Sequence, residues 1–268
     1  IIIFAQQITY SKNKDEIEAI GNVEFKDLNK NIKIKTQKAI YQKKLEKFFT
    51  EGKTIANINI GYEFDSNNVT FLKNKMILFS SSKTKIKDKK NSLYELDSFE
   101  YQIDKEFLKG KNIFIVENTE KNLRETNRLF FKDGFFDLKN QIFKTSDTKI
   151  SLKKNIFDRS ENDPRLYGAS SSHKDGVTTI KKAVFTSCKN NSDQKCPPWS
   201  LEASEIKHDK NKKQLIYENS ILKIYDFPVF YFPKFFHPDP TVKRQSGFLM
   251  PRFNNSNILG SSFNTPYF

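Results

Sequence analysis

The side chains able to do acid–base, nucleophilic or metal chemistry are few and dispersed in this sequence. The three histidines, His173, His208 and His237, stand alone, whereas catalytic and metal sites gather such groups at characteristic spacings. No Gly-x-Ser-x-Gly, His-Glu-x-x-His or glycine-rich phosphate motif occurs. The serine-rich run at residues 170–173 is predicted to be a turn. We therefore expect no enzyme, no metal centre and no cofactor.

Two cysteines, Cys188 and Cys196, flank a polar loop rich in Lys and Asn. A zinc site would need further Cys or His ligands close by, and the sequence has none there. In an exported protein a local disulfide between the two is the simplest interpretation. Two free buried thiols are the alternative.

The net charge of +14 comes almost entirely from lysine. Proteins that read base edges rely on the arginine fork, and arginine is scarce here, so we expect no nucleic-acid partner. The lysines are spread along the chain and alternate with apolar residues. This pattern favours a solvated strand face first, and attraction to an anionic lipid or glycolipid second.

Strict alternation of apolar and polar residues predicts β-strands, for example at residues 32–35, 99–104 and 149–153. Clusters of Lys, Asn and Asp separate such runs and are typical of tight turns, for example at residues 29–31 and 89–91. No long stretch keeps a capped helical period. The fold class is therefore predicted to be all-β, an array of antiparallel hairpins stacked along one axis.

Without helices to cover its apolar face, such a sheet must fold over on itself as a sandwich, a jelly roll or a V-shaped groove. An open side would make the lining a surface for an acyl chain, and a closed one would make it merely a core. The pattern leaves both possibilities open. The candidates for the lining are Phe99, Tyr101, Ile103, Ile150 and Leu152.

The two ends of the chain differ from its middle. Residues 1–5 are three Ile, a Phe and an Ala before polar Gln-Gln, which resembles the end of a secretory signal and its cleavage site; an ordinary buried strand is the alternative. The sequence contains no stretch of 18 apolar residues, so it predicts no transmembrane helix. Eight of the nine prolines lie at position 197 or later, so the tail is built differently from the hairpin array.

Three motifs distinguish this tail: Cys-Pro-Pro-Trp-Ser-Leu-Glu-Ala-Ser-Glu-Ile at 196–206, Pro-Val-Phe-Tyr-Phe-Pro at 228–233 and Arg-Gln-Ser-Gly-Phe-Leu-Met-Pro at 244–251. They resemble segments of lipopolysaccharide-assembly proteins of the LptD family (OstA/Imp type). The run at 244–251 is the most specific of the three. Residues 19–23 (Ala-Ile-Gly-Asn-Val) resemble the opening of OstA-type repeats. The strong resemblance covers about 196–268; the rest is similar as an OstA-like repeat array.

This resemblance implies a folded-over antiparallel sheet, the β-taco or β-jellyroll, followed by the first strands of a truncated outer-membrane β-barrel. The implied domains are a signal-peptide remnant (1–5), a periplasmic OstA-like domain (6–240) and the incomplete start of the barrel (241–268). The implied location is the cell outer membrane, with this segment mainly in the periplasm.

The resemblance also implies a role and partners. The domain would receive lipopolysaccharide from the periplasmic bridge protein LptA, which would add a strand at an open edge near Val23 and Phe25. The acyl chains would pass along the apolar groove to a lateral barrel gate weakened by Pro251 and Pro266, with LptE as the plug lipoprotein of the barrel.

The chain departs from the family in its cysteines. Disulfides in that family join the N-terminal domain to the barrel, whereas Cys188 and Cys196 stand eight positions apart, so disulfide-controlled maturation is in doubt. Two other functions stay open: an LptA-like periplasmic lipid carrier without a barrel, and a repetitive β surface or adhesion protein.

Overall fold

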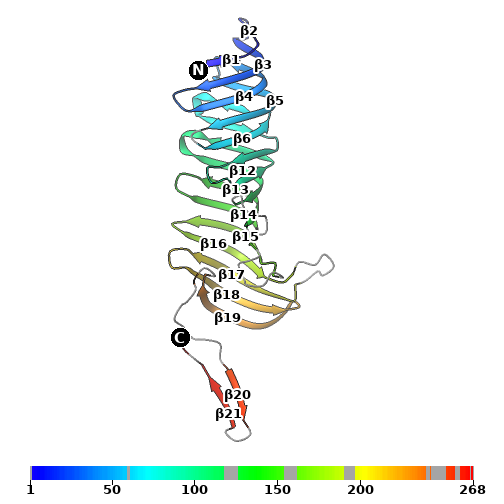
Figure 1. The fold of residues 1–268 in the computed structure, drawn as a ribbon, viewed down its shortest axis with the longest axis vertical. Coiled ribbons are helices and arrows are strands. Elements are labelled where there is room, and N and C mark those ends of the chain that lie inside the picture. The colour runs from blue at the N-terminus through cyan, green and yellow to red at the C-terminus, as the bar shows by residue number, and fades with distance from the viewer. Residues whose placement is uncertain are drawn as a thin grey trace.

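The computed structural model describes residues 2–58, 61–117, 126–153, 162–189, 197–239, 242, 252–256, 260–265 and 267. Nineteen strands of this part join one sheet, and neighbouring strands run antiparallel. Figure 1 shows them following one another down the long axis, from β1 near the N-terminus to β19. The strands are β1 (Ile2–Phe4), β2 (Gln7–Ser11), β3 (Glu16–Asp27), β4 (Ile32–Gln42), β5 (Lys47–Ile58), β6 (Tyr62–Asn67), β7 (Thr70–Leu72), β8 (Ile77–Ser80), β9 (Thr84–Lys87), β10 (Leu93–Leu96), β11 (Ser98–Gln102), β12 (Phe107–Val116), β13 (Arg128–Asp137), β14 (Ile142–Ser151), β15 (Arg165–Lys174), β16 (Val177–Thr186), β17 (Trp199–Asp209), β18 (Gln214–Ile224) and β19 (Phe227–Pro238).

The sheet folds over because its strands bend at a corner near their middle. At the corner Gly21 and Asn22 of β3 have positive φ values of 80° and 46°, and Gly52 of β5 has 81°. The register shifts at the same places, as expected where a strand carries a β-bulge. Glycine and asparagine suit these positions because they tolerate the left-handed region.

Polar side chains tie one corner to the next. Asn22 N–H donates to Gln37 Oε1 at 3.3 Å, and Gly52 N–H donates to Asn68 Oδ1 at 2.8 Å. Further along the array, the Asn112 amide donates to Asp97 at 2.8 Å. These bonds replace ladder hydrogen bonds that the bends interrupt.

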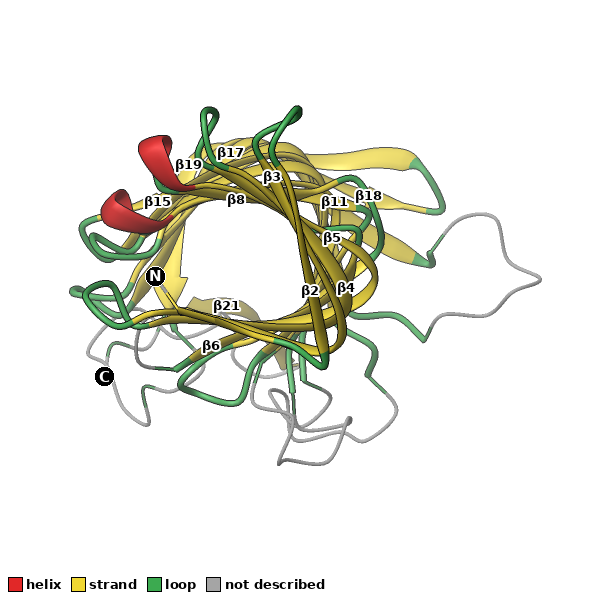
Figure 2. Ribbon diagram, turned by 90° about the horizontal axis from the view of Figure 1, so that it is seen from above, coloured by secondary structure: helices red, strands yellow, loops and turns green. Residues whose placement is uncertain are grey.

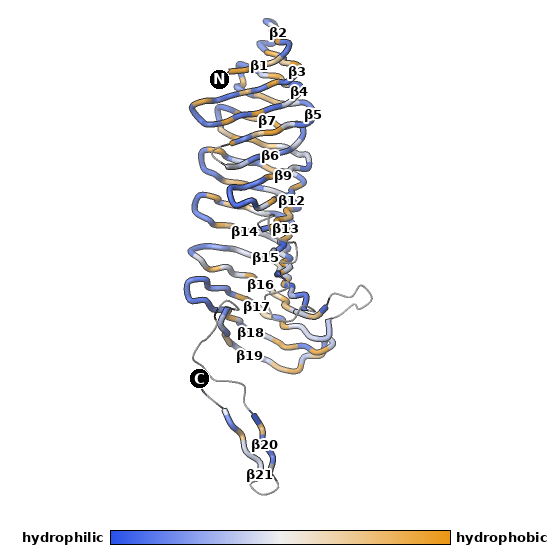
Figure 3. The backbone as a smooth tube through the Cα atoms, in the orientation of Figure 1, coloured by the Kyte–Doolittle hydropathy of each residue, from blue (hydrophilic) through white to orange (hydrophobic). Residues whose placement is uncertain are grey.

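The corner divides the sheet into two walls. Wall 1 contains the halves of β3, β4 and β5 spanning 23–27, 32–36 and 53–58; wall 2 contains the halves spanning 16–20, 38–42 and 47–51. The same division continues through the array, with β6, β9 and β10 in wall 1 and β7, β8 and β11 in wall 2. Seen along the axis, the strands bend round a common interior (Figure 2). Polar residues mark the strand ends in Figure 3, and apolar residues the strands between them.

The all-β, folded-over antiparallel class predicted from the sequence is confirmed. A separate two-stranded sheet follows it, β20 (Arg252–Ser256) with β21 (Gly260–Asn264). The only helices in the described ranges are two short 3-10 turns, η1 (Lys73–Lys75) and η2 (Ile103–Lys105). None of the helical segments described has the length and apolar character that crossing a bilayer requires.

The described strands and turns bear on three local expectations. The predicted turn at residues 170–173 is wrong, because these residues lie within β15, where Ser171 is buried against Thr145. Residues 2–4, expected at the end of a signal sequence, form β1 and pair with β3. The Asn-rich turns at residues 29–31 and 89–91 are confirmed, with Asn31 and Asn91 at positive φ.

Candidate functional site

A continuous line of apolar residues runs along the inner face of wall 1 and crosses strands from β3 to β19. Residues directly opposite each other on neighbouring strands share one face of a sheet, so the pairing register defines this line. We call it row 1. Its members, in order, are Phe25, Ile34, Ala56, Phe64, Ile86, Tyr94, Ile115, Leu129, Ile150, Leu166, Phe185, Leu201, Leu222 and Phe230.

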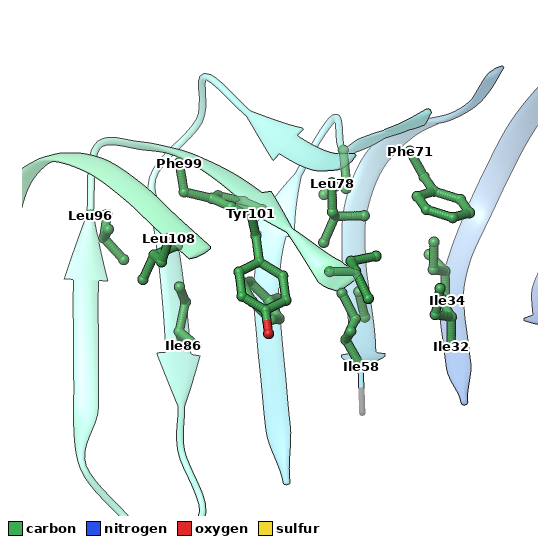
Figure 4. Packing of buried hydrophobic residues seen from close by; sticks show 14 of the residues in the cluster. Ile32, Ile34, Ile58, Phe71, Leu78, Ile86, Leu96, Phe99, Tyr101 and Leu108 are labelled. Atoms are coloured by element: carbon green, nitrogen blue, oxygen red, sulfur yellow. The ribbon is translucent and has the colours of Figure 1, made fainter. Parts of the chain in front are cut away.

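In the N-terminal part of the array, from β3 to β14, the interior is filled by side chains from both walls. Phe25 of wall 1 lies 4.6 Å from Phe48 of wall 2, and Phe64 lies 5.2 Å from Phe99, measured between ring centroids. Phe25 is fully buried. Figure 4 shows this packing among Ile32, Leu78 and their neighbours. This part is a close-packed core.

Three of the predicted lining residues lie in this core. Phe99, Tyr101 and Ile103 are all buried, at 4%, 0% and 3% exposure. They come from β11 and the adjoining η2, and they point inward, as Figure 4 shows for Phe99 and Tyr101. The inward orientation agrees with the sequence pattern. Their role in contacting a lipid stays a prediction.

The C-terminal part, from β15 to β19, has a second and smaller core. Leu166 and Leu201 of row 1 are each 8% exposed, and Phe230 at the end of the row is 57% exposed. Ile150, a predicted lining residue on β14, packs against this second core. Leu152, the fifth candidate, is half-buried just beyond β14, where its N–H donates to Pro164 O at 2.9 Å. Three of the five candidates thus lie in the first core, and Ile150 packs against the second.

A second line, row 2, runs along the inner face of wall 2 and changes character at β15. Up to β14 it is aromatic or aliphatic; beyond that it contains all the histidines of the chain. Sequence reasoning missed this row, because the histidines are far apart along the chain and only the strand register brings them together. Its members from β7 onward are Phe71, Leu78, Tyr101, Leu108, Phe136, Phe143, His173, Thr178, His208, Leu215 and His237.

Each histidine of row 2 has a defined partner. The His173 ring stacks on Phe143, and its Nδ1 is 2.8 Å from Thr178 Oγ1. The Nε2 atom of His208 bonds to Asp239, and Nε2 of His237 lies 2.9 Å from the Tyr217 hydroxyl.

Burial shifts two pKa values in this region. It lowers the pKa of His173, with smaller lowering contributions from Lys210 and His208 and a raising one from Asp175. Burial also raises the pKa of Tyr217 to about 12, so this tyrosine keeps its proton.

Small hydroxyl side chains line the interior beside the corner. In the N-terminal part they are hydrogen-bonded: Thr54 Oγ1 is 2.6 Å from Thr50 Oγ1 and donates to Gly52 O at 3.1 Å. In the C-terminal part Ser220 is fully buried, and its Oγ has no hydrogen-bond partner among the described residues. Ser220 thus differs from Thr54, whose buried hydroxyl has hydrogen-bond partners.

In the described sheet β1 covers the edge predicted at Val23 and Phe25, and the role of this edge in binding a bridge protein stays a prediction. Both residues are buried on β3, which pairs with β4 on one side and with β1 and β2 on the other. Phe25 lies opposite Ile3 of β1. The N-terminal edge of the described sheet is instead formed by β1 and β2.

Other predicted site residues cannot be placed. The gate residues Pro251 and Pro266, and one member of the predicted disulfide, Cys196, lie outside the described residues. Cys188 is half-buried, with its Sγ 3.9 Å from Trp199 O. The disulfide and the gate stay predictions.

The outer face of the sheet carries lysines paired with acids. Glu24 lies between Lys26 and Lys33, at 2.8 Å and 2.6 Å. Hydrogen bonds from Lys26 and then Lys33 lower the pKa of Glu24 to about 2. No cluster of His, Cys, Asp and Glu suited to a metal ion occurs within the described ranges.

Three curated relatives of this chain have the same name. The LPS-assembly protein LptD of Legionella pneumophila (strain Paris) is 35% identical over 89 residues, 33% of this chain and 10% of the relative. That of Pseudomonas aeruginosa (strain UCBPP-PA14) is 32% identical over 92 residues, 34% of this chain and 9% of the relative. That of Shewanella denitrificans is 30% identical over 158 residues, 57% of this chain and 20% of the relative.

No family model matches the chain. The chain spans about a tenth of the length of the first of these relatives. The resemblance predicted from the sequence is confirmed over these segments, in which the chain is similar to the LPS-assembly protein LptD.

Proposed function

We propose that this chain takes part in lipopolysaccharide transport and assembly at the outer membrane. In this proposal it receives lipopolysaccharide from a periplasmic bridge protein. It then passes the acyl chains along row 1 to a lateral gate in a membrane barrel, with the described sheet in the periplasm. The chain acts by binding and guiding rather than by catalysis.

The observation that carries the proposal is the continuity of row 1. Every strand from β3 onward that belongs to wall 1 contributes an apolar residue to it, and the row ends at the exposed Phe230. A soluble domain needs a core, but it does not need that core to continue as an unbroken line to an exposed sheet edge. Acyl chains bind along extended apolar surfaces of this kind. The shared name of the similar proteins supports the same role.

Site-specific photo-crosslinking tests the proposal in the full-length protein in cells. The photoreactive residue replaces Leu166 or Leu201 of row 1, and adducts are detected by blotting for lipopolysaccharide. Each position has a matched control next to it, because neighbours in a strand point to opposite faces. The controls are Tyr167 and Glu202, which belong to the outer face.

Adducts at Leu166 and Leu201 that disappear when upstream transport is blocked, with none at Tyr167 and Glu202, are the expected result. Equal adducts on both faces, or none on either, would contradict a conduit along row 1. Crosslinking from Phe99 and Tyr101 then shows whether the closed N-terminal core opens during transport.

The entry point in this proposal is the N-terminal edge, where LptA would add a strand. β1 covers the Glu24–Lys26 stretch of β3. If a signal peptidase cleaves after Ala5, as the sequence predicts, β1 is lost and this stretch of β3 becomes the open edge. A chain that begins at Gln6 should then bind LptA more tightly than the chain that begins at Ile1. Equal binding would place the bridge protein elsewhere.

The exit in this proposal is the segment that follows β19. The hairpin β20–β21 lies between the predicted gate prolines, Pro251 and Pro266, and we assign it to the barrel with its LptE plug. The alternative is an LptA-like carrier. Both terminal strands, β2 and β19, pair on one side only in the described sheet, which an end-to-end carrier would also require. If the sequence downstream contains many alternating strands of about 10 residues each, it favours the barrel over the carrier.

A further inference from the structure

The interior of the C-terminal part has two chemically different walls. Row 1 presents apolar residues there, among them Leu166, Leu201 and Leu222. Row 2 presents His173, Thr178 and His208 on three successive strands. No such contrast exists in the N-terminal part, where the same row holds Phe71, Leu78 and Tyr101.

Two of the row 2 histidines have a ring nitrogen without a partner in the described structure. His173 uses Nδ1 toward Thr178, and His208 uses Nε2 toward Asp239. The other nitrogen of each ring has no hydrogen bond within the described residues. His237 differs, because Nδ1 is 2.7 Å from Pro238 O and Nε2 is 2.9 Å from the Tyr217 hydroxyl. His173 and His208 thus have hydrogen-bonding capacity that His237 lacks.

Lysines surround the end of wall 2 beside these histidines. The β15–β16 and β17–β18 turns lie against each other, since Asn211 Nδ2 donates to Asp175 O at 2.9 Å and Lys210 N–H donates to Gly176 O at 3.1 Å. The exposed lysines of these turns are Lys174, Lys210, Lys212 and Lys213. Lys210 is close enough to His173 to act on its charge.

The acids near this group are already engaged. Asp239 bonds to His208, and Asp209 accepts the N–H groups of Asn211 and Lys212. Asp175 lies 3.9 Å from Lys174 on the exposed turn. Four lysines stand beside these three aspartates, so the local balance of charge is positive.

We propose that His173 and His208, with Lys210 at the end of wall 2, bind the phosphate groups of a lipid whose acyl chains lie along row 1. This inference rests on the proposed function and adds the part of the lipid that wall 2 recognises. Phosphate fits because its oxygens accept several hydrogen bonds and are strongly attracted to ammonium and imidazolium groups. Adjacent strands are about 4.8 Å apart. The two histidines, on alternate strands, are therefore about 10 Å apart, which suits a head group carrying more than one phosphate.

The test compares two lipids that differ only in phosphate: bis-phosphorylated lipid A, and the same lipid after phosphatase treatment. Binding to the full chain is measured by fluorescence for the unaltered protein and for H173F/H208Q and K210Q. Phe suits position 173 because Phe143 precedes it in row 2, and Gln at 208 can still donate to Asp239. H237F, in the same row, and K149Q, on the exposed outer face, are the matched controls.

The unaltered chain should bind the phosphorylated lipid more tightly than the dephosphorylated one. H173F/H208Q should lose about tenfold in affinity for the phosphorylated lipid, because charge-assisted hydrogen bonds are lost. Its affinity for the dephosphorylated lipid should change less than about twofold, as should both affinities of the controls. Equal binding of the two lipids by the unaltered chain would overturn the inference and leave the apolar conduit intact. If neither lipid binds, the result would instead contradict the proposed function itself.

Histidine NMR gives a second measurement, independent of affinity. Adding phosphorylated lipid to chain labelled with ¹⁵N-histidine should shift the ring ¹⁵N signals of His173 and His208 and leave those of His237 unchanged. Inorganic phosphate at the same concentration should produce little change. An equal change with inorganic phosphate would identify a free-anion site and overturn the assignment to a lipid.

Discussion

The N-terminal and C-terminal parts of this sheet share one register and differ in how their interior is filled. From β3 to β14, rings of both walls meet, as Phe64 does with Phe99 and Tyr101 at 5.2 Å and 5.4 Å. From β15 onward, Leu166 and Leu201 of row 1 are each 8% exposed, and the row ends at Phe230, which is 57% exposed. One architecture can therefore serve as a closed core at one end and an accessible surface at the other.

The largest expected difference between the two parts is in the cost of removing a ring. Phe64→Ala should lower the free energy of unfolding by about 3–5 kcal/mol, because it leaves a cavity between closely packed rings. Phe230→Ala should cost less than about 1 kcal/mol, because that ring is already more than half exposed. Urea unfolding measures both. Similar costs at the two sites would show that the C-terminal part is as closed as the N-terminal part.

Buried hydroxyl groups provide a second comparison. Thr54→Val should destabilise the chain by about 1–2 kcal/mol, since it removes the bonds to Gly52 O and Thr50. Ser220→Ala should be neutral or stabilise by up to about 1 kcal/mol, because the Ser220 Oγ is buried without a partner. Thermal unfolding of the two variants checks this. Clear destabilisation by Ser220→Ala would mean that its hydroxyl has a bound partner, such as a water.

Replacing a glycine at a corner of the sheet should be destabilising even where there is room for a larger side chain. A Cβ at Gly52 would meet no atom within 4 Å, yet φ is 81°. Gly52→Ala should therefore cost about 1–2 kcal/mol from backbone strain alone. Gly110→Ala in the same sheet should be destabilising because of a steric clash, since its Cβ would come within 2.3 Å of Leu96. Urea unfolding of both variants tests this; a neutral Gly52→Ala would show that the corner does not need the left-handed conformation.

Local patterns in the sequence predicted the strands and many turns, but not the register between distant strands. Alternation around Phe99 and Tyr101 suffices to predict an inward face, because it depends on neighbours two positions away. The histidine row depends on β15, β17 and β19 lying in register, which no local pattern encodes. The pairing near Val23 and Phe25 was missed for a similar reason: β1 and β2 pair with β3, which the sequence suggested was an edge strand. The serine run in β15 was misjudged because strand pairing overrides its local turn preference.

The smallest effect expected is a pH dependence confined to the C-terminal part. Burial lowers the pKa of His173, so the folded state binds fewer protons than the unfolded chain near and below the ordinary value of 6.5. The resulting stability is present above that value and is lost as the pH falls through it. Hydrogen exchange should therefore accelerate in β15–β17 between pH 7.5 and 5.5, after correction for the intrinsic rate, and not in β3–β5. H173F should abolish the difference, because position 173 then resembles Phe143 in the same row. If β3–β5 accelerates equally, or if H173F leaves the change in place, His173 is not its source.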